Sequence, residues 1–429
     1  MESLRFGSSP ASLCEPPPET DTVPADIVVD LAGGAARQGI PVLTIEFCGR
    51  GTFPAGLGEM VAGGGQAELA VRIDGAVVAR GRPMIQDRLW LTRASSNLLA
   101  GAISLVLQAV GQFAAGQAAV AAGGPETAAG RGLFAWHYPL FLGKGVAERV
   151  VRKIRRGRRP FYWQVAYRRV DGPGIAETGK LDGPPFKVLS DDGSRFYADP
   201  FVIERDDRVY MFVEEFPYAT GRGVISVSQL QDDGTFATPR IVLQEPHHLS
   251  YPQVFARDGE IYMIPESATA RELVLYRAEQ FPDVWVRDTV LLHDRDVNDA
   301  TLHESGGRLW LLGTERFGYG SASDTMVVYS AERLRGPWIA HALNPVAVDH
   351  SATRPGGAFV RGEGGTILPV QNGSETYGGG LGLMRLERLD HGDVRFSRPR
   401  PVLPGPAWAR KGIHTLNRAG AIEVVDSCG

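Results

Sequence analysis

The 429-residue sequence has little cysteine and no recognisable export signal. Its three cysteines, Cys14, Cys48 and Cys428, are scattered and form no C-x-x-C pair, which excludes a disulfide framework and a cysteine zinc site. They indicate a reducing compartment. The N-terminus lacks a basic segment followed by an apolar one, so we expect no signal peptide and a cytoplasmic protein.

The sequence also lacks an excess of basic charge. Lysine and arginine number 45 against 49 aspartates and glutamates, giving a net charge of −4, which argues against a dedicated nucleic-acid-binding protein. No G-x-S-x-G motif is present, and the glycine runs follow strand-like segments rather than leading into helices, so neither a serine nucleophile nor a phosphate loop is expected. The histidines show no metal-ligand spacing.

The first 110 residues combine a polar tail with a small α/β domain. Residues 1–25 are rich in proline, serine and glutamate and are predicted to be disordered. Within residues 26–110, the runs DIVVDLAG and PVLTIEFCG predict buried strands, and the Asp-Gly pair in ELAVRIDGAVVARGR predicts a hairpin. A helix is predicted from Asn97, as its N-cap, to Val110.

Residues 111–160 are expected to form a linker that is first rich in alanine and glycine and then basic. The uncharged stretch from Ser95 to Pro125 is long enough to span a membrane, but its glutamines and glycines favour a helix followed by this linker. The basic run has two interpretations, a solvated linker or peripheral contact with an anionic lipid surface. It spans residues 149–160 and carries Arg149, Arg152, Lys153, Arg155, Arg156, Arg158 and Arg159.

An internal repeat begins after residue 161. The segment DPFVIERDDRVYMFVEE starts at Asp199 and aligns with YPQVFARDGEIYMIPES, which starts at Tyr251. Further copies start at Asp299, Arg354 and His414. Each copy reads as strand, polar turn, strand, and the first four are followed by another strand pair. Four strands in each unit of about 50 residues are typical of a propeller blade.

The fifth repeat contains only two strands. Residues 161–170 and 180–190 precede the first repeat and supply the two missing outer strands if the ring closes between its two ends, which also protects the sheet edges. The sequence therefore predicts a mainly β fold, with a five-bladed β-propeller at residues 161–429 preceded by the small α/β domain.

The repeat predicts a polar cluster at one mouth of the propeller. The inner strands of the five blades start with polar or bifunctional residues, and the ends of the second strands lie beside those starts. Carboxylates in such a cluster suit acid/base cleavage of a glycosidic bond, although they could instead cap strands or pair with arginines. The catalytic candidates are Asp199, Glu214, Glu266 and Asp299. The substrate-binding candidates are His248, Ser250, Tyr251, His303, Arg354, Gln371 and His414.

Several long strings carry a family resemblance. FYADPFVIERDDRVYMFVEEF (196–216), HLSYPQVF (248–255), RPGG (354–357) and PVQNGSETYGGGL (369–381) are examples. They resemble the propeller-like N-terminal domain of plant glucosamine inositolphosphorylceramide transferases and its bacterial relatives. The resemblance covers residues 137–400 and implies a role with glycans or glycoconjugates. In the plant proteins, sugar transfer is attributed to a separate C-terminal glycosyltransferase domain.

Two further resemblances are more local. The string YADPF is similar to the entry strand of five-bladed furanosidases, which implies that Asp199 is a general base and that the acid falls at Asp299. Tyr251 stands where those enzymes carry a carboxylate, and some of them hold a channel calcium near the position of His414. Residues 26–110 resemble the later part of a formyltransferase-like domain, as a truncated remnant.

We therefore expect a carbohydrate-active propeller that binds a glycan or glycoconjugate at its mouth, with glycoside hydrolysis or glycosyl transfer by carboxylate chemistry. Two alternatives stay open. One is a non-catalytic glycan-recognition module in surface polysaccharide or glycolipid biosynthesis. The other is a formyl-group transferase acting through residues 26–110. Apart from the calcium implied near His414, no cofactor or metal is expected, and the sequence leaves the oligomeric state open.

Overall fold

The computed structural model describes residues 26–31, 39–62, 66–86, 88–117, 137–156, 161–362, 364–408 and 412–428. The disorder predicted for residues 1–25 lies outside the described residues. The chain divides into two compact units, one of residues 1–158 with 318–321 and one of residues 159–317 with 322–429.

The first unit contains a four-stranded sheet in the order β1-β2-β3-β4. Its strands are β1 (Val28–Asp30), β2 (Val42–Phe47), β3 (Leu69–Ile73) and β4 (Ala76–Gly81), and helix α2 (Phe53–Ala62) follows β2. The strands β3 and β4 form the predicted hairpin. Its turn residues, Asp74 and Gly75, have φ angles of 47° and 83°, the left-handed conformation that an Asp-Gly turn favours.

The long helix of this unit starts earlier than predicted. Helix α3 (Leu91–Ala114) begins after Trp90, so the predicted N-cap at Asn97 is wrong. Asn97 is instead an interior residue of α3 with a buried side chain. Its Oδ1 accepts a hydrogen bond from the backbone N–H of Gln86 at 3.2 Å. By length and composition alone α3 could cross a membrane, but it buries one face, including Leu98 and Leu105.

A second long helix, α4 (His137–Arg156), lies in the segment expected to be a linker. It contains the first part of the basic run, and its apolar residues Leu140 and Ile154 are exposed. The contact of residues 149–159 with anionic lipid stays a prediction.

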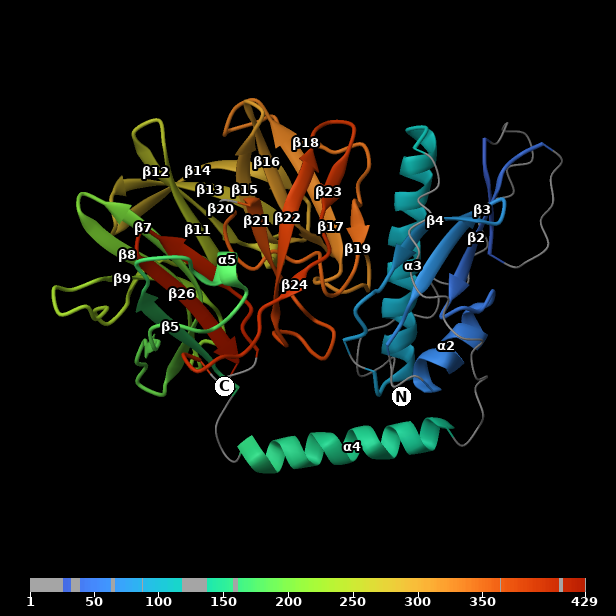
Figure 1. Cartoon of the computed structure of the whole chain (residues 1–429), viewed down its shortest axis with the longest axis horizontal. Helices are drawn as coiled ribbons and strands as arrows, with labels where there is room; N and C mark the ends of the chain where they lie inside the picture. Colours follow the sequence, from blue (N-terminus) through green and yellow to red (C-terminus); the bar gives the residue numbers. More distant parts are fainter. Residues whose placement is uncertain are drawn as a thin grey trace. The chain divides into compact units, whose positions relative to one another are not determined.

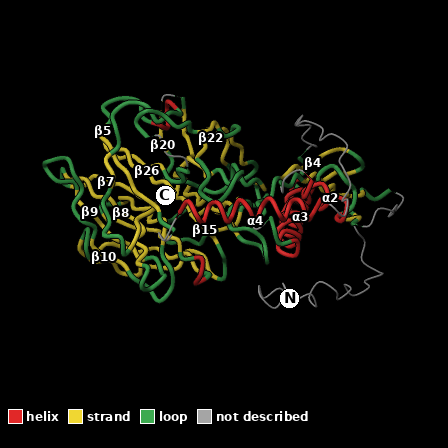
Figure 2. Tube along the Cα trace, turned by 90° about the horizontal axis from the view of Figure 1, so that it is seen from below, coloured by secondary structure: helices red, strands yellow, loops and turns green. Residues whose placement is uncertain are grey.

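The second unit consists of five sheets of four or five strands, and strands dominate it in Figure 2. Each sheet is an antiparallel blade, and the strands of the first four blades follow one another in the sequence (Figure 1). Blade one contains β7 (Arg195–Arg205), β8 (Arg208–Pro217), β9 (Val224–Gln229) and β10 (Arg240–Leu243). Blade two contains β11 (Ser250–Arg257), β12 (Glu260–Glu266), β13 (Glu272–Gln280) and β14 (Val284–His293). Blade three contains β15 (Val297–Ser305), β16 (Arg308–Glu315), β17 (Thr325–Ala331), β18 (Ile339–Ala340) and β19 (Ala347–Val348). Blade four contains β20 (Val360–Gly362), β21 (Gly365–Gln371), β22 (Leu381–Leu389), β23 (Val394–Phe396) and β24 (Arg400–Pro401).

The fifth blade joins the two ends of the propeller sequence. Its order is β25-β26-β5-β6, built from β25 (Leu416–Ala419), β26 (Ile422–Cys428), β5 (Trp163–Arg169) and β6 (Lys187–Val188). Strand β26 pairs with β5 from Ile422↔Arg169 to Cys428↔Trp163. The predicted closure is therefore confirmed, with β5 and β6 as the outer strands.

A separate apolar core fills each space between neighbouring blades, including the space between blade five and blade one. Because five cores link five blades in a cycle, the sheets close into a ring, and the predicted five-bladed propeller is confirmed. Pairs that represent these cores in blade order are Phe212 with Met263, Leu275 with Leu311, Leu312 with Leu368, Leu383 with Val425, and Val424 with Val213.

A buried ion pair lies on the closing strands. Nη2 of Arg168 in β5 lies 2.7 Å from Oε2 of Glu423 in β26, and both side chains are almost fully buried. The other oxygen of Glu423 accepts a hydrogen bond from the backbone N–H of Ile175, the first residue of helix α5 (Ile175–Thr178). The pair thus ties both closing strands to the segment that connects β5 with β6.

We predict that Glu423→Gln lowers the free energy of unfolding by about 3 kcal/mol, because it leaves the Arg168 guanidinium buried without a carboxylate partner. The matched control is Asp171→Asn, which removes an exposed ion pair with Arg169 next to the same strand and should cost less than about 1 kcal/mol. Urea denaturation of the three proteins measures both values. The prediction would be contradicted if both variants lost the same small amount of unfolding free energy.

Candidate functional site

The first residues of three repeats share an unusual backbone conformation. Asp199, Tyr251 and Asp299 have φ angles of 48°, 45° and 50°, in the left-handed region that side-chain-bearing residues rarely adopt. Each lies at a break in the pairing of the inner strand with its neighbour, the mark of a β-bulge. Strain of this kind costs on the order of 1–3 kcal/mol per residue and gathers at functional sites.

Tyr251 lies near the start of β11, the inner strand of blade two. It is fully buried, and its hydroxyl contacts Thr301 Oγ1 at 2.9 Å and accepts a hydrogen bond from the backbone N–H of Gly357 at 2.7 Å. One side chain therefore connects blades two, three and four. The polar residues that surround it are called the axial cluster below. They are Asp199, Glu214, Glu266, Asp299, Arg354, Gln371, His414 and Asp426.

Arg354 organises one half of the axial cluster. Its guanidinium binds both oxygens of Asp299, at 2.6 and 3.2 Å, and one oxygen of Glu266 at 3.3 Å. Gln371 also donates to Asp299 at 2.5 Å. The carbonyl oxygen of the Gln371 side chain is buried and has no hydrogen-bond partner among the described residues, which is unusual for a buried acceptor.

Asp199 organises the other half, together with blade five. Its Oδ1 accepts a hydrogen bond from the hydroxyl of Thr415 at 2.9 Å and lies 3.6 Å from His414 Nε2. The other ring nitrogen of His414 binds Asp426 Oδ1 at 2.7 Å, and Asp426 Oδ2 accepts the backbone N–H of Asp199. The His414 ring is stacked on Trp163, with ring centroids 3.8 Å apart.

Glu214 lies against the loop that precedes blade two. His248 Nδ1 accepts a hydrogen bond from the backbone N–H of Gly223, so the proton of the neutral ring is on Nε2, which faces Glu214 Oε1 at 3.4 Å. Burial lowers the pKa of His248, consistent with a neutral ring. Ser250, the first residue of β11, is buried and pairs with Glu266, the last residue of β12.

Burial shifts the carboxyl groups of the axial cluster toward their protonated forms. It raises the pKa of Asp199 from 3.8 to about 6, against the opposing charge of His414. Burial, reinforced by the charges of Asp199 and Asp299, raises the pKa values of Glu214 and Glu266 well above their usual range. Burial alone would lower the pKa of His414, but Asp426 and Asp199 reverse the effect and raise it.

One predicted site residue lies elsewhere. His303 is near the hairpin end of β15, where its ring stacks on Phe359 and lines a small cavity with the turn residues Gly306 and Gly307. The prediction that His303 belongs to the polar cluster at the mouth is wrong, because it lies four residues, or about 13 Å, further along the strand than Asp299. The other predicted residues come together at one end of the propeller, with Tyr251 as an inter-blade contact rather than an exposed group.

Sequence reasoning missed three residues of the site. Asp426 lies in the last part of the second strand of the fifth repeat, as Glu214 and Glu266 do in their own repeats, so the repeat already contained this signal. Trp163 and Tyr377 could not be found in this way, since neither belongs to an inner strand pair. The half-exposed Tyr377 ring faces both Arg354 and His414.

Asp199, His414 and Asp426 are close enough to hold a metal ion, since their ligand atoms lie within 4.8 Å of one another. They fit calcium poorly. Calcium takes six to eight oxygen ligands, whereas this set offers two carboxylates and a nitrogen. The same atoms already bind one another, Thr415 and backbone N–H groups. We therefore derive no step through a metal.

Comparison with known families places a match inside the propeller. Residues 188–398 match the family model described as Glucosamine inositolphosphorylceramide transferase 1, N-terminal. The chain is 35% identical over 229 residues to Glucosamine inositolphosphorylceramide transferase 1 of Oryza sativa subsp. indica, covering 52% of this chain and 30% of that protein. The protein of the same name from Arabidopsis thaliana is 34% identical over 207 residues, covering 47% and 27%. The chain thus spans less than a third of the length of these relatives.

Solved structures with similarity to the chain include glycoside hydrolases. A thermostable family-43 glycoside hydrolase is 14% identical, with 50% of this chain and 78% of that chain covered and a TM-score of 0.38. Zg3597, a family 117 glycoside hydrolase from Zobellia galactanivorans, is also 14% identical, with 62% and 90% covered and a TM-score of 0.40. At these TM-scores the fold assignment rests on the strand pairing and the inter-blade cores described above.

We predict that Asp199→Asn stabilises the protein at pH 7.5. A folded-state pKa raised from 3.8 to about 6 means that the native protein loses up to about 3 kcal/mol as pH rises from 4 to above 6, and the amide removes this loss. Thermal unfolding at pH 4 and 7.5 measures the difference, which should vanish at the lower pH.

The matched control is Asp426→Asn. Asp426 accepts hydrogen bonds from the backbone N–H groups of Asp199, His414 and Thr415, so an amide in its place puts a donor against donors and lowers the melting temperature. Equal destabilisation by both variants at pH 7.5 would refute the assignment of a charged, strained Asp199.

Proposed function

We propose that the propeller binds a glycan or glycoconjugate at the axial cluster and that the carboxyl groups of the cluster carry acid/base chemistry at a glycosidic bond. One observation carries the proposal. Asp199, Glu214 and Glu266 converge from blades one and two, are buried, and all have raised pKa values. Groups with such shifts at a shared position are candidates for catalysis.

The two halves of the axial cluster favour different roles. With a pKa of about 6, Asp199 is ionised at neutral pH and suits a general base. Burial and the charge of Asp299 raise the pKa of Glu266 well above its usual range, so this carboxyl group suits a general acid. Arg354 holds Asp299 and Glu266 in place. The free Gln371 carbonyl oxygen and the Tyr377 ring are positioned to bind sugar hydroxyls and a sugar face.

The family match supports the glycoconjugate part of this proposal, because the relatives are named for transfer of glucosamine to inositolphosphorylceramide. The propeller of this chain would then recognise or process the sugar part of a glycolipid. The relatives named above are plant proteins, so the bacterial part of the predicted resemblance has no support from them.

A non-catalytic recognition module is the second candidate. It is favoured by the bidentate Arg354–Asp299 pair and by Tyr251, which tie neighbouring blades together as structural contacts do. Formyl transfer by residues 26–110 gains no support from the family match, which lies within residues 188–398. The cytoplasmic location stays a prediction.

We predict that Asp199→Asn and Glu266→Gln each lower kcat by at least about 100-fold on a glycan that the protein turns over, because each removes one proton-transfer group. The substrate is found by testing a panel of furanosides, pyranosides and sugar–phospholipid conjugates for product release by mass spectrometry. Asp283→Asn serves as control, since Asp283 forms an exposed ion pair with Arg240 away from the axial cluster. Glycan binding without turnover of any substrate would favour the recognition module.

The pH dependence of kcat/KM follows from the same assignments. Activity should rise as Asp199 loses its proton near pH 6 and fall at higher pH as Glu266 loses its own. In Asp199→Asn, residual activity should lack the rising limb. An unchanged rising limb in that variant would assign the base to another residue.

A further inference from the structure

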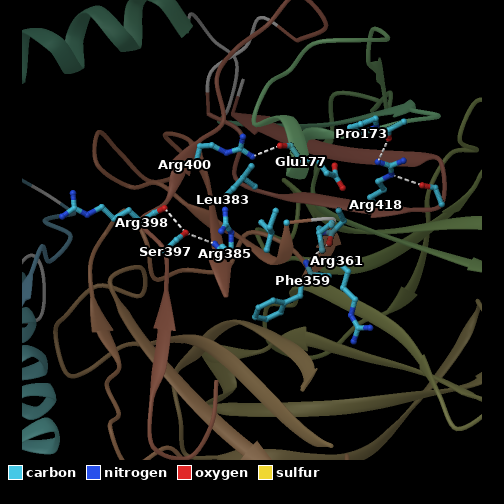
Figure 3. Close-up of a pocket in the computed structure, with 18 residues that line it drawn as sticks. Pro173, Glu177, Phe359, Arg361, Leu383, Arg385, Ser397, Arg398, Arg400 and Arg418 are labelled. Atoms are coloured by element: carbon cyan, nitrogen blue, oxygen red, sulfur yellow. Dashed lines mark hydrogen bonds between the residues drawn. The ribbon is translucent and has the colours of Figure 1, made fainter. Parts of the chain in front are cut away.

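A second polar cavity lies at the opposite end of the propeller, between blades four and five (Figure 3). Its volume is about 1170 Å³. The lining includes Gly362, Gly364 and Gly420, which belong to the turns between the inner strand pairs of these two blades. Since Arg354 and His414 precede the same strands at their other end, the cavity is separate from the axial cluster.

Among the residues that the structure describes, five arginines line this cavity, which we call the arginine cavity, and the carboxylate beside them is that of Glu177. The Glu177 carboxylate accepts a hydrogen bond from the backbone N–H of Gly174. Within the described part of the chain, none of the five guanidinium groups lies within ion-pair distance of an aspartate or glutamate. The five are Arg361, Arg385, Arg398, Arg400 and Arg418.

This grouping is unusual for the molecule. In the described part of the propeller only eight arginines form no ion pair, and five of these eight line the arginine cavity. Arg388 illustrates the usual pattern. It lies on β22, three residues after Arg385, and binds Asp390 at 2.7 Å. Among the described residues, the lack of acidic partners for these arginines is therefore a local property of the cavity wall.

Two of the five arginines are fixed by neutral acceptors. Arg400 donates to the backbone carbonyl oxygens of Ala176, Glu177 and Thr178. Arg418 donates in the same way to carbonyl oxygens of Val170, Gly172 and Gly420. Carbonyl groups orient a guanidinium but do not neutralise it, so the cavity keeps its positive charge.

The wall of the cavity is also partly apolar. Phe359, Val360, Ile367 and Leu383 contribute to it alongside the arginines. Figure 3 shows Arg385 near the middle of the lining residues, beside Ser397 and Leu383, while Arg398 extends outward. The Arg385 side chain has no hydrogen-bond or ion-pair partner in the described residues, so its donors are available.

We propose that the arginine cavity binds a phosphoryl group carried by an organic molecule. A phosphoryl dianion can accept hydrogen bonds from several guanidinium groups at once. A carboxylate has fewer acceptor oxygens and a smaller charge, so it suits a group of arginines less well. The volume is far larger than inorganic phosphate needs and lies just above the range of about 300–1,000 Å³ of small-molecule sites. The apolar wall then contacts the organic part. The proposal rests on the geometry of this cavity and is independent of the chemistry assigned to the axial cluster.

Calorimetric titration of the purified chain with glucose 6-phosphate, glucose and inorganic phosphate tests the proposal. We expect glucose 6-phosphate to bind, with affinity falling as salt increases, and glucose not to bind. Arg385→Gln should weaken binding at least about tenfold, whereas Arg388→Gln, on the same strand but outside the cavity, should not change it. Both residues are exposed, so neither variant endangers folding.

Flotation with phosphatidylcholine vesicles, with and without phosphatidic acid, separates the two sources of the phosphoryl group. Binding to phosphatidic acid that depends on Arg385 assigns a lipid headgroup, and binding of glucose 6-phosphate alone assigns a soluble ligand. Absence of binding in both assays overturns the proposal, as does an equal loss in Arg388→Gln. If inorganic phosphate binds as tightly as glucose 6-phosphate, the proposal that the cavity also contacts the organic part of the ligand is refuted.

Discussion

The pairing of β26 with β5 is the constraint on which the rest of the propeller depends. It completes blade five from the two ends of the propeller sequence and thereby brings His414, Thr415 and Asp426 against Asp199 of blade one. Without this pairing the inter-blade core between blades five and one would lack Val165 and Val424. The axial cluster is thus a product of ring closure, and its residues meet only when all five blades are in place.

Within that ring, the buried axial cluster contains more acidic than basic side chains. Arg354 offsets part of this charge, and His414, held between Asp426 and Asp199, offsets more. The remaining imbalance appears as the raised pKa values of Asp199, Glu214 and Glu266. A purely structural core would bury apolar side chains here at lower cost, which is why this arrangement points to chemistry or recognition.

Much of this architecture could be predicted from the sequence, because a repeat of about 50 residues fixes the blades, their register and which residues begin the inner strands. From the repeat we also correctly predicted that Asp199, Glu266, Asp299 and Arg354 lie in one cluster. The repeat could not predict contacts made by residues outside the inner strand pairs. The stacking of Trp163 on His414 depends on how β5 docks after closure, and the start of α3 depends on tertiary packing that overrides the capping preference of Asn97.

The composition of blade five has a consequence for how the molecule is made on the ribosome. Strand β5 emerges first among the propeller strands, yet its central partner β26 is translated after all the other blades. Its unpaired edge stays open through that whole interval, and such edges invite association with other nascent chains. The ring can therefore close only after the last strand has been synthesised, and until then β5 lacks its central partner.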